Sequence, residues 1–281
     1  MVEKSKPVIS ISGSTGFVGT NLGKFLSSQN ISVINLSRKK QKSFKSKKTL
    51  VFSDIDDIPK IHCDALVHLI GTGAQTTSSD YESVNVRQTQ KIINLCKKSK
   101  IKKIIYISGL GVSDNTTFGY FISKLKAERL IKESRLDYTI LRASYIVGSD
   151  DPLSQNLTRQ IKNGTILVPG SGSYRLQPIS IHDVCRVILE SVHNKNLSNK
   201  TVDLVGPKTI SFANYVKKFA RGKKAKIKKI PLEQAYFDAL NNPENALYGI
   251  DDLNIMIGDF TSSHHKLEKL SGIKLKTPEI L

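Results

Sequence analysis

Three glycines stand at a spacing of three residues near the start of the chain, in Gly13-Ser14-Thr15-Gly16-Phe17-Val18-Gly19. They directly follow an apolar, strand-like run at residues 8–12 and open a stretch with helical periodicity. A tight glycine turn between a strand and a helix presents backbone N–H groups and the positive end of the helix dipole to a pyrophosphate. We therefore expect a dinucleotide to bind along this segment. The alternative is a flexible loop whose glycines only permit a turn.

The end of the second expected strand carries Ser37, Arg38 and Lys39 and no acidic residue. An acid at this place accepts hydrogen bonds from the ribose hydroxyls of NAD, whereas an arginine pairs with the 2′-phosphate of NADP. We expect NADP(H), with NAD(H) as the alternative, and with Ser37 and Lys39 assisting Arg38. Asp54, just past the third expected strand, is a candidate for the adenine edge or a plain turn residue.

Tyr120 and Lys124 are four residues apart in a helical stretch, so their side chains share one face. A nearby ammonium stabilises a phenolate for proton transfer, and the same lysine can hold a nicotinamide ribose. Ser108 and Ser113 follow the preceding strand and bring hydroxyl groups to the edge where open α/β sheets bind ligands. We expect these residues to be catalytic; the alternative is a helix that shows an aromatic and a cation by chance.

These candidates need a scaffold, and short β-branched runs alternate with helical stretches through the first 143 residues. Runs that are apolar almost throughout suit a parallel sheet covered on both faces. The pattern predicts an α/β fold with a doubly wound parallel sheet. The strands are expected at residues 8–12, 31–36, 50–52, 65–70, 103–108 and 138–141, and the helices at residues 17–28, 81–96 and 118–133.

The pattern loosens after Gly148. We expect a Gly-rich turn at residues 169–173, a strand at 201–205, and helices at 153–163, at 182–193, from the N-cap Ser211 through Phe219, and from Ser263 to just before Gly272. Residues 1–148 are thus expected to form the nucleotide-binding domain. Residues 149–281 are expected to complete the sheet and form a smaller substrate or partner lobe. We expect residues 164–174 to shape a substrate pocket, with Arg142 and Arg175 as anion clamps; for Arg142 a structural ion-pair role is the alternative.

The chain of 281 residues has a formal net charge of +19. Its basic residues cluster at 38–48, 97–103 and 217–229. Clustered cations suit RNA or an acidic membrane surface. Because most of the cations are lysines, the favoured interpretation is a set of solvated faces, and an RNA or acidic-surface partner is the alternative.

Cys63, Cys96 and Cys185 are odd in number and far apart, which argues against a disulfide framework. His264-His265 has no partner at metal-ligand spacing, so we expect it to begin a helix and expect no metal site. No apolar stretch approaches the roughly 18 to 20 residues that a membrane span needs, and residues 1–7 lack the features of a secretory signal. We expect a cytoplasmic protein, with a peripheral place at a membrane as the variant.

Together the motifs resemble an extended or atypical short-chain dehydrogenase/reductase of the NAD-dependent epimerase/dehydratase group. Within that superfamily the chain is most similar to the group around the nucleotide-binding accessory subunit of respiratory complex I. The resemblance covers nearly the whole chain and rests on the glycine turn, Tyr81-Glu82-Ser83-Val84-Asn85-Val86, Tyr106-Ile107-Ser108, Tyr120 to Lys124, Leu141 to Gly148, Gln177 to Val184, and Leu204-Val205-Gly206-Pro207 with the following Ser211.

The resemblance implies a Rossmann fold with NAD(P) on the glycine turn, Tyr120 as proton donor or acceptor, and Lys124 on the ribose. The function expected from it is an NADP(H)-dependent oxidoreductase or epimerase/dehydratase that acts on a carbonyl or carbinol substrate. One alternative is a non-catalytic NADPH-binding accessory or sensor with a quinone-related or respiratory partner. Another is an RNA-binding atypical member.

Overall fold

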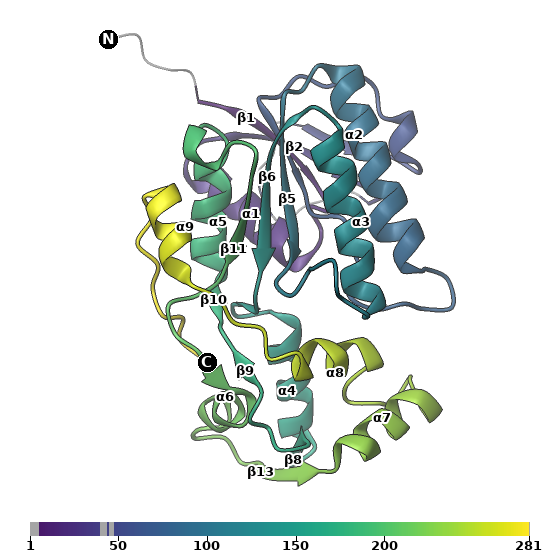
Figure 1. Ribbon diagram of the computed structural model, residues 1–281, viewed down its shortest axis with the longest axis vertical. Helices are drawn as coiled ribbons and strands as arrows, with labels where there is room; N and C mark the ends of the chain where they lie inside the picture. The colour runs from purple at the N-terminus through teal and green to yellow at the C-terminus, as the bar shows by residue number, and fades with distance from the viewer. Residues whose placement is uncertain (1–5, 40–43, 45–47, 281) are drawn as a thin grey trace.

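The computed structural model describes residues 6–39, 44 and 48–280, so part of the first basic cluster lies outside the described residues. A seven-stranded parallel sheet forms the upper part of the molecule as drawn in Figure 1, in the strand order β11-β6-β5-β4-β1-β2-β3. The strands are β1 (Val8–Ser12), β2 (Ser32–Ser37), β3 (Lys48–Val51), β4 (Ala65–His68), β5 (Lys103–Gly109), β6 (Asp137–Ala143) and β11 (Lys200–Leu204). The order reverses between β1 and β4, so the ligand crevice of a doubly wound sheet is expected there.

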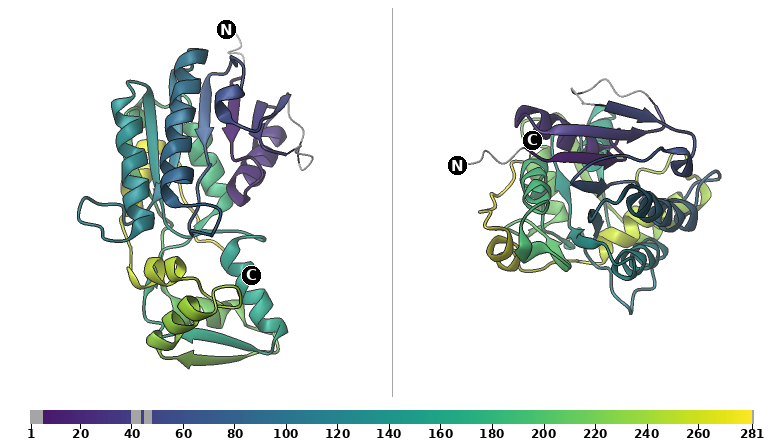
Figure 2. Two further views of the ribbon diagram at one scale, coloured as in Figure 1. Left: turned by 90° about the vertical axis from the view of Figure 1, so that its right-hand side faces the viewer. Right: turned by 90° about the horizontal axis from the view of Figure 1, so that it is seen from above.

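Helices cover both faces of this sheet (Figure 2). On one face, α1 (Phe17–Ser28), α5 (Ile181–Glu190) and α9 (His264–Ser271) pack against the strands through buried aliphatic residues such as Leu22 and Val184. On the other face lie α2 (Gln88–Ser99) and α3 (Gly119–Glu133), with Ile92 and Ala127 in the second core. The two cores explain why the central strands are apolar along their whole length. The predicted Rossmann fold is confirmed.

A smaller lobe lies below the carboxyl edge of the sheet, with a core of its own (Figure 1). Its helices are α4 (Pro152–Lys162), α6 (Phe212–Phe219), α7 (Leu232–Asn241) and α8 (Ile250–Ile257). Three two-stranded pairings join β7 (Ile146–Val147) to β10 (Ile179–Ser180), β9 (Arg175–Leu176) to β12 (Ile210–Ser211), and β8 (Thr165–Pro169) to β13 (Lys226–Ile230). In contrast, α5, β11 and α9 belong to the large domain, so the chain crosses to the small lobe and back.

Within the described residues, no helix is both long and apolar enough to cross a membrane. Cys63, Cys96 and Cys185 all lie in the described part, and all three are free thiols.

Candidate functional site

The glycine turn connects β1 to α1, and two of its glycines are required by close backbone contacts. Gly13 has φ of 75°, and a Cβ there would lie 2.8 Å from the carbonyl carbon of Leu69. A Cβ on Gly19 would overlap the Gly13 carbonyl oxygen and lie 2.7 Å from the Cα of Ser14. At Gly16 a Cβ would meet only the Gly13 oxygen, at 3.5 Å, so this glycine leaves room on its outer side.

Gly16 is also the N-cap of α1, where no side chain caps the helix and the first turn has no acidic residue. The positive end of the helix dipole therefore stays available to an anion. A cavity of about 920 Å³ opens in front of it. Seven of the predicted cofactor residues line this cavity: Gly13, Thr15, Gly16, Ser37, Arg38, Lys39 and Asp54. Ser14, Phe17, Val18 and Gly19 support the turn and do not line the cavity.

The lining of the cavity includes the positive charges of Arg38 and Lys39. Both side chains are exposed, and no ion pair joins either of them to another described residue. Ser37 is buried, and its hydroxyl oxygen accepts a hydrogen bond from the Lys39 amide at 3.2 Å, which fixes the start of this segment. A free guanidinium at this place suits a phosphate monoester.

Asp54 is committed to local contacts. Its carboxylate accepts hydrogen bonds from Lys91 Nζ at 2.6 Å and from the Asp56 amide at 2.9 Å, and it caps the turn at Ile55–Asp57. The Lys91 ammonium, with the Asp56 amide, holds the pKa of Asp54 below its usual range. Asp54 borders the cavity, so its contact with an adenine remains a prediction.

Lys124 lies next to Gly71, which forms part of the cavity wall. Its Nζ would lie 3.0 Å from a Cβ on Gly71, which itself lines the cavity. The ammonium donates a hydrogen bond to the Ile107 carbonyl at 3.3 Å and lies 5.0 Å from the centre of the Tyr106 ring. Burial lowers the pKa of Lys124 to about 8, although the charge of Glu128 opposes the shift.

Tyr120 lies one helical turn before Lys124 and packs edge-on against Tyr81 and Phe121, with ring centres at 6.1 and 5.1 Å. The Lys124 Nζ is 5.9 Å from the centre of the Tyr120 ring, so the predicted juxtaposition is present. Burial raises the pKa of Tyr120 to about 12. The phenol is therefore protonated at neutral pH, the form of a proton donor.

The two candidate serines differ in their exposure to solvent. Ser108 is buried, and its Oγ has no hydrogen-bond partner among the described residues, so it is not bonded to Tyr120. Ser113 is exposed in the turn after β5. Gly109 lies close to the phenol, since a Cβ at this position would lie 3.3 Å from the Tyr120 hydroxyl. The roles of Ser108 and Ser113 remain predictions.

Asn85 was not singled out as a site residue, although it lies in the motif that begins at Tyr81. It stands in the π-helical turn η2 (Glu82–Arg87) before α2. Its Oδ1 accepts from the Thr72 amide at 2.8 Å, and its Nδ2 donates to the Thr72 carbonyl at 3.1 Å and to Ser123 Oγ at 2.9 Å. Asn85 thereby ties α3 to the segment that borders the cavity.

A buried histidine connects this cluster to the glycine turn. Thr89 Oγ1 donates to the Asn85 carbonyl at 2.6 Å, so the 2.9 Å contact with His68 Nε2 requires that His68 be the donor there. His68 Nδ1 then accepts from Ser12 Oγ, also at 2.9 Å. Burial, reinforced by the charge of Lys124, lowers the pKa of His68 to about 3.

The His68 pKa predicts a pH dependence of stability. The unfolded chain takes up a proton on His68 near pH 6.5, whereas the folded chain resists it to about pH 3. The unfolding free energy is therefore expected to fall below pH 6.5, with this group contributing up to about 1.4 kcal/mol per pH unit. The unfolding free energy, measured by urea unfolding at several pH values in this range, should depend less steeply on pH for His68→Asn than for the parent. An equal dependence on pH in the two proteins would refute the buried neutral histidine.

Arg142 and Arg175 are structural ion-pair partners. The Arg142 guanidinium donates to both oxygens of the fully buried Glu128 carboxylate, at 2.9 and 2.8 Å, and so joins β6 to α3. Arg175 pairs with Asp259, just after α8, at 2.7 Å. Both contacts occupy the guanidinium edge that an anion clamp would use.

His264, His265 and Glu268 lie together in the first turns of α9, with potential ligand atoms within 4.8 Å of one another. The Glu268 carboxylate already accepts from the Leu275 amide at 2.9 Å and from Lys274 Nζ at 3.2 Å. With a lysine and a helix N-terminus beside it, the cluster is electrostatically unfavourable for a cation.

The small lobe closes one side of the Tyr120 region. The Phe260 ring packs against Phe121 with ring centres 5.0 Å apart and occupies the space where Gly111 has no side chain. A second cavity, of about 330 Å³, lies inside the small lobe between α4 and α8. Its lining is mostly apolar and includes Tyr145, Leu153, Arg159, Phe212, Tyr248 and Met256.

A Rossmann sheet with an anion-binding glycine turn defines a dinucleotide-binding protein. The family model described as NAD(P)H-binding matches residues 13–195, and the chain belongs to this NAD(P)H-binding family. The solved structure of MoeE5 in complex with UDP-glucuronic acid and NAD superimposes with a TM-score of 0.77 at 16% identity, covering 97% of this chain and 95% of that one. The UDP-glucuronic acid 4-epimerase from Bacillus cereus, in complex with UDP-glucuronic acid and NAD, gives 0.75 at 17% identity and covers 96% and 95% of the two chains.

Curated relatives include a subunit of a respiratory enzyme. The mitochondrial NADH dehydrogenase [ubiquinone] 1 alpha subcomplex subunit 9 of Dictyostelium discoideum is 23% identical over 222 residues, which are 74% of this chain and 62% of the relative. The mitochondrial NADH-ubiquinone oxidoreductase 40 kDa subunit of Neurospora crassa is 25% identical over 54% of this chain and 40% of its own length. The chain thus spans about two fifths to three fifths of these relatives. The predicted resemblance is confirmed, in fold for an NAD-binding epimerase and in sequence for this subunit.

Proposed function

We propose that this chain is an NADP(H)-dependent oxidoreductase of the short-chain dehydrogenase type, acting on a carbonyl or carbinol substrate. The observation that carries the proposal is the cavity at the β1–β4 crevice, which is lined both by the glycine turn and by the free cations Arg38 and Lys39. The glycine turn would hold the pyrophosphate, Arg38 with Lys39 the 2′-phosphate, and Lys124 the nicotinamide ribose. The bound coenzyme supplies or accepts the hydride.

In this proposal the protein's own part is proton transfer and orientation. Tyr120 holds its proton at neutral pH and would donate it to the oxygen of a reduced carbonyl. Lys124 is held in place by its hydrogen bond to the Ile107 carbonyl. The apolar cavity of the small lobe would receive the body of the substrate.

A second candidate function is a cofactor-holding accessory subunit without turnover. Gly109 favours this accessory function, because it lies close to the Tyr120 hydroxyl and has no hydroxyl of its own to bind a substrate oxygen. The relatives from respiratory enzymes suit the same interpretation. Absence of NADPH oxidation across a panel of carbonyl compounds, together with co-purification of respiratory subunits identified by mass spectrometry, would select this function over the first.

Coenzyme choice provides the test of the 2′-phosphate site. Arg38→Ala removes a charge-assisted contact that is present only with NADPH, so NADPH should bind at least about tenfold more weakly while NADH affinity stays nearly constant. Arg221→Ala, an exposed arginine on the small lobe, is the matched control and should change neither affinity. Equal losses for the two coenzymes in Arg38→Ala would refute the assignment.

A further inference from the structure

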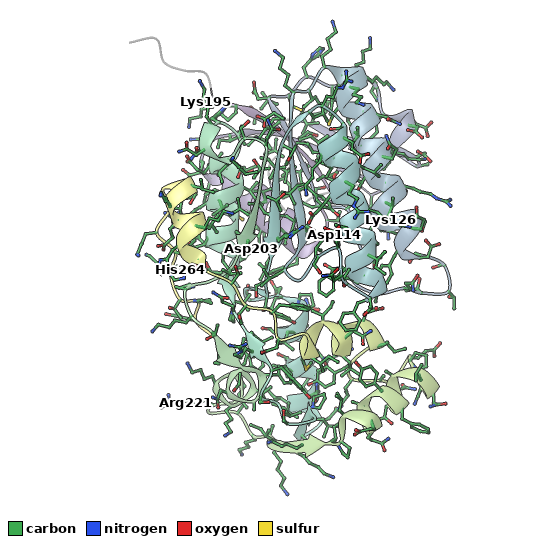
Figure 3. All side chains as sticks on the ribbon, viewed as in Figure 1. Asp114, Lys126, Lys195, Asp203, Arg221 and His264 are labelled. Atoms are coloured by element: carbon green, nitrogen blue, oxygen red, sulfur yellow. The ribbon has the colours of Figure 1, made fainter. Side chains whose placement is uncertain are left out.

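The far end of the small lobe carries a cluster of exposed basic residues that are close in sequence, which we call the basic tip. It runs from the last turn of α6 through the following loop along β13, at the opposite end of the molecule from the top of the parallel sheet (Figure 1). Figure 3 shows Arg221 at this end. The basic tip consists of eight exposed residues: Lys217, Lys218, Arg221, Lys223, Lys224, Lys226, Lys228 and Lys229.

Among the described residues, no acidic side chain neutralises the charge of the basic tip. Residues 217–229 include no acid, and no ion pair joins the basic tip to any other described residue. Elsewhere lysines are paired, as in Lys91 with Asp56 at 3.1 Å and Lys126 with Glu82 at 2.9 Å. Crowded like charges repel one another, and an anionic partner would relieve that repulsion.

Large apolar side chains are exposed on β13 and on α7, the helix that follows it. Ile227 of β13 is 41% exposed, and Phe237 and Leu240 of α7 are 61% and 65% exposed. Phe237 and Leu240 are three residues apart and therefore lie on one side of α7, while the buried Ala235 and Ala239 face the lobe core. Because α7 follows β13 almost directly, the cations and the apolar side chains lie at the same end of the molecule (Figure 1).

This combination selects one class of partner. Seven of the eight cations are lysines, which interact with anions as point charges, whereas planar recognition of nucleic-acid phosphates and bases favours arginine. Of the three exposed apolar side chains only Phe237 has a ring on which a base could stack, whereas all three can enter the acyl-chain boundary of a bilayer. We propose that the basic tip docks on an anionic phospholipid bilayer, with its lysines at the headgroups and with Phe237 and Leu240 in the interface.

The experiment is flotation of the full chain with vesicles of phosphatidylcholine and phosphatidylglycerol in equal parts, compared with phosphatidylcholine alone. Docking predicts binding to the anionic vesicles only, weakened by high salt because surface charges are screened. The triple variant Lys226→Glu, Lys228→Glu, Lys229→Glu should lower the binding at least about tenfold. The double variant Phe237→Ser, Leu240→Ser should lower the fraction that survives high salt.

The matched control is Lys97→Glu, Lys100→Glu, Lys102→Glu, an equal charge change at three exposed lysines around the end of α2. It should retain vesicle binding, and thermal unfolding should show that both triple variants are folded. The proposal is overturned if the control loses as much binding as the tip variant, or if the tip variant binds as the parent does. It is also overturned if the tip variant loses affinity for a single-stranded RNA oligonucleotide and keeps its affinity for vesicles.

Discussion

Replacing Tyr120 by phenylalanine is expected to lower the rate of NADPH-dependent carbonyl reduction by at least about 100-fold, the usual contribution of a positioned general acid. The substitution removes one hydroxyl and keeps the ring that packs against Tyr81 and Phe121. The NADPH dissociation constant should therefore stay within about twofold of that of the parent. Steady-state rates over a carbonyl panel, with calorimetric NADPH titration beside them, measure both quantities.

Two further readouts separate proton transfer from packing. Tyr81→Phe is the matched control, because the Tyr81 hydroxyl donates to the Gly73 carbonyl at 2.9 Å and is assigned no chemistry; it should lower the rate far less. The rate of the parent should also fall as the pH rises through about 8, because Lys124 loses its proton there while Tyr120 keeps its own to about 12. Equal rates for Tyr120→Phe and the parent would refute the catalytic assignment.

The glycine turn should respond very differently to a methyl group at two of its positions. In Gly19→Ala the new methyl would overlap the Gly13 carbonyl oxygen and crowd the Ser14 Cα, so the turn must move. Both the melting temperature and coenzyme binding should fall, the latter below detection. In Gly16→Ala the methyl clashes with no protein atom, so little stability should be lost. It would, however, border the cavity where the coenzyme phosphate is proposed to bind, so coenzyme affinity should fall about tenfold.

Gly73→Ala provides the control for this pair, because no atom lies within 4 Å of a Cβ at that position. Thermal unfolding and calorimetric NADPH titration of the three variants measure the contrast. If Gly16→Ala binds NADPH as the parent does, the coenzyme phosphate does not approach this turn as proposed.

The sheet could be predicted because its strands are buried on both faces and its helices repeat the apolar spacing that packs against them. The predicted helix at residues 17–28 coincides with α1, and Ser211 accepts from the Asn214 amide as the expected N-cap of α6. The small lobe was harder to predict. The strand β13 is mostly exposed and lies within a run of lysines, so it lacks the apolar pattern that predicts a strand. The helices α7 and α8 follow a segment without clear periodicity.

The site divides in a similar way. Glycine spacing at a strand end and a tyrosine four residues before a lysine are local signals, and both motifs lie on the elements where they were predicted. His68 contacts residues that are 56 and 21 positions away in the sequence. Gly71 and Gly109 matter because they lack a side chain beside Lys124 and Tyr120. Such neighbours cannot be identified from local patterns in one sequence, so the structure was needed to find them.

Calorimetric titration of the full chain with NADPH, and in parallel with NADH, tests the central claim most directly. A coenzyme seated between the glycine turn and Arg38 predicts one site per chain and a preference of at least about tenfold for NADPH. Failure of both coenzymes to bind at millimolar concentration would contradict the assignment of this crevice.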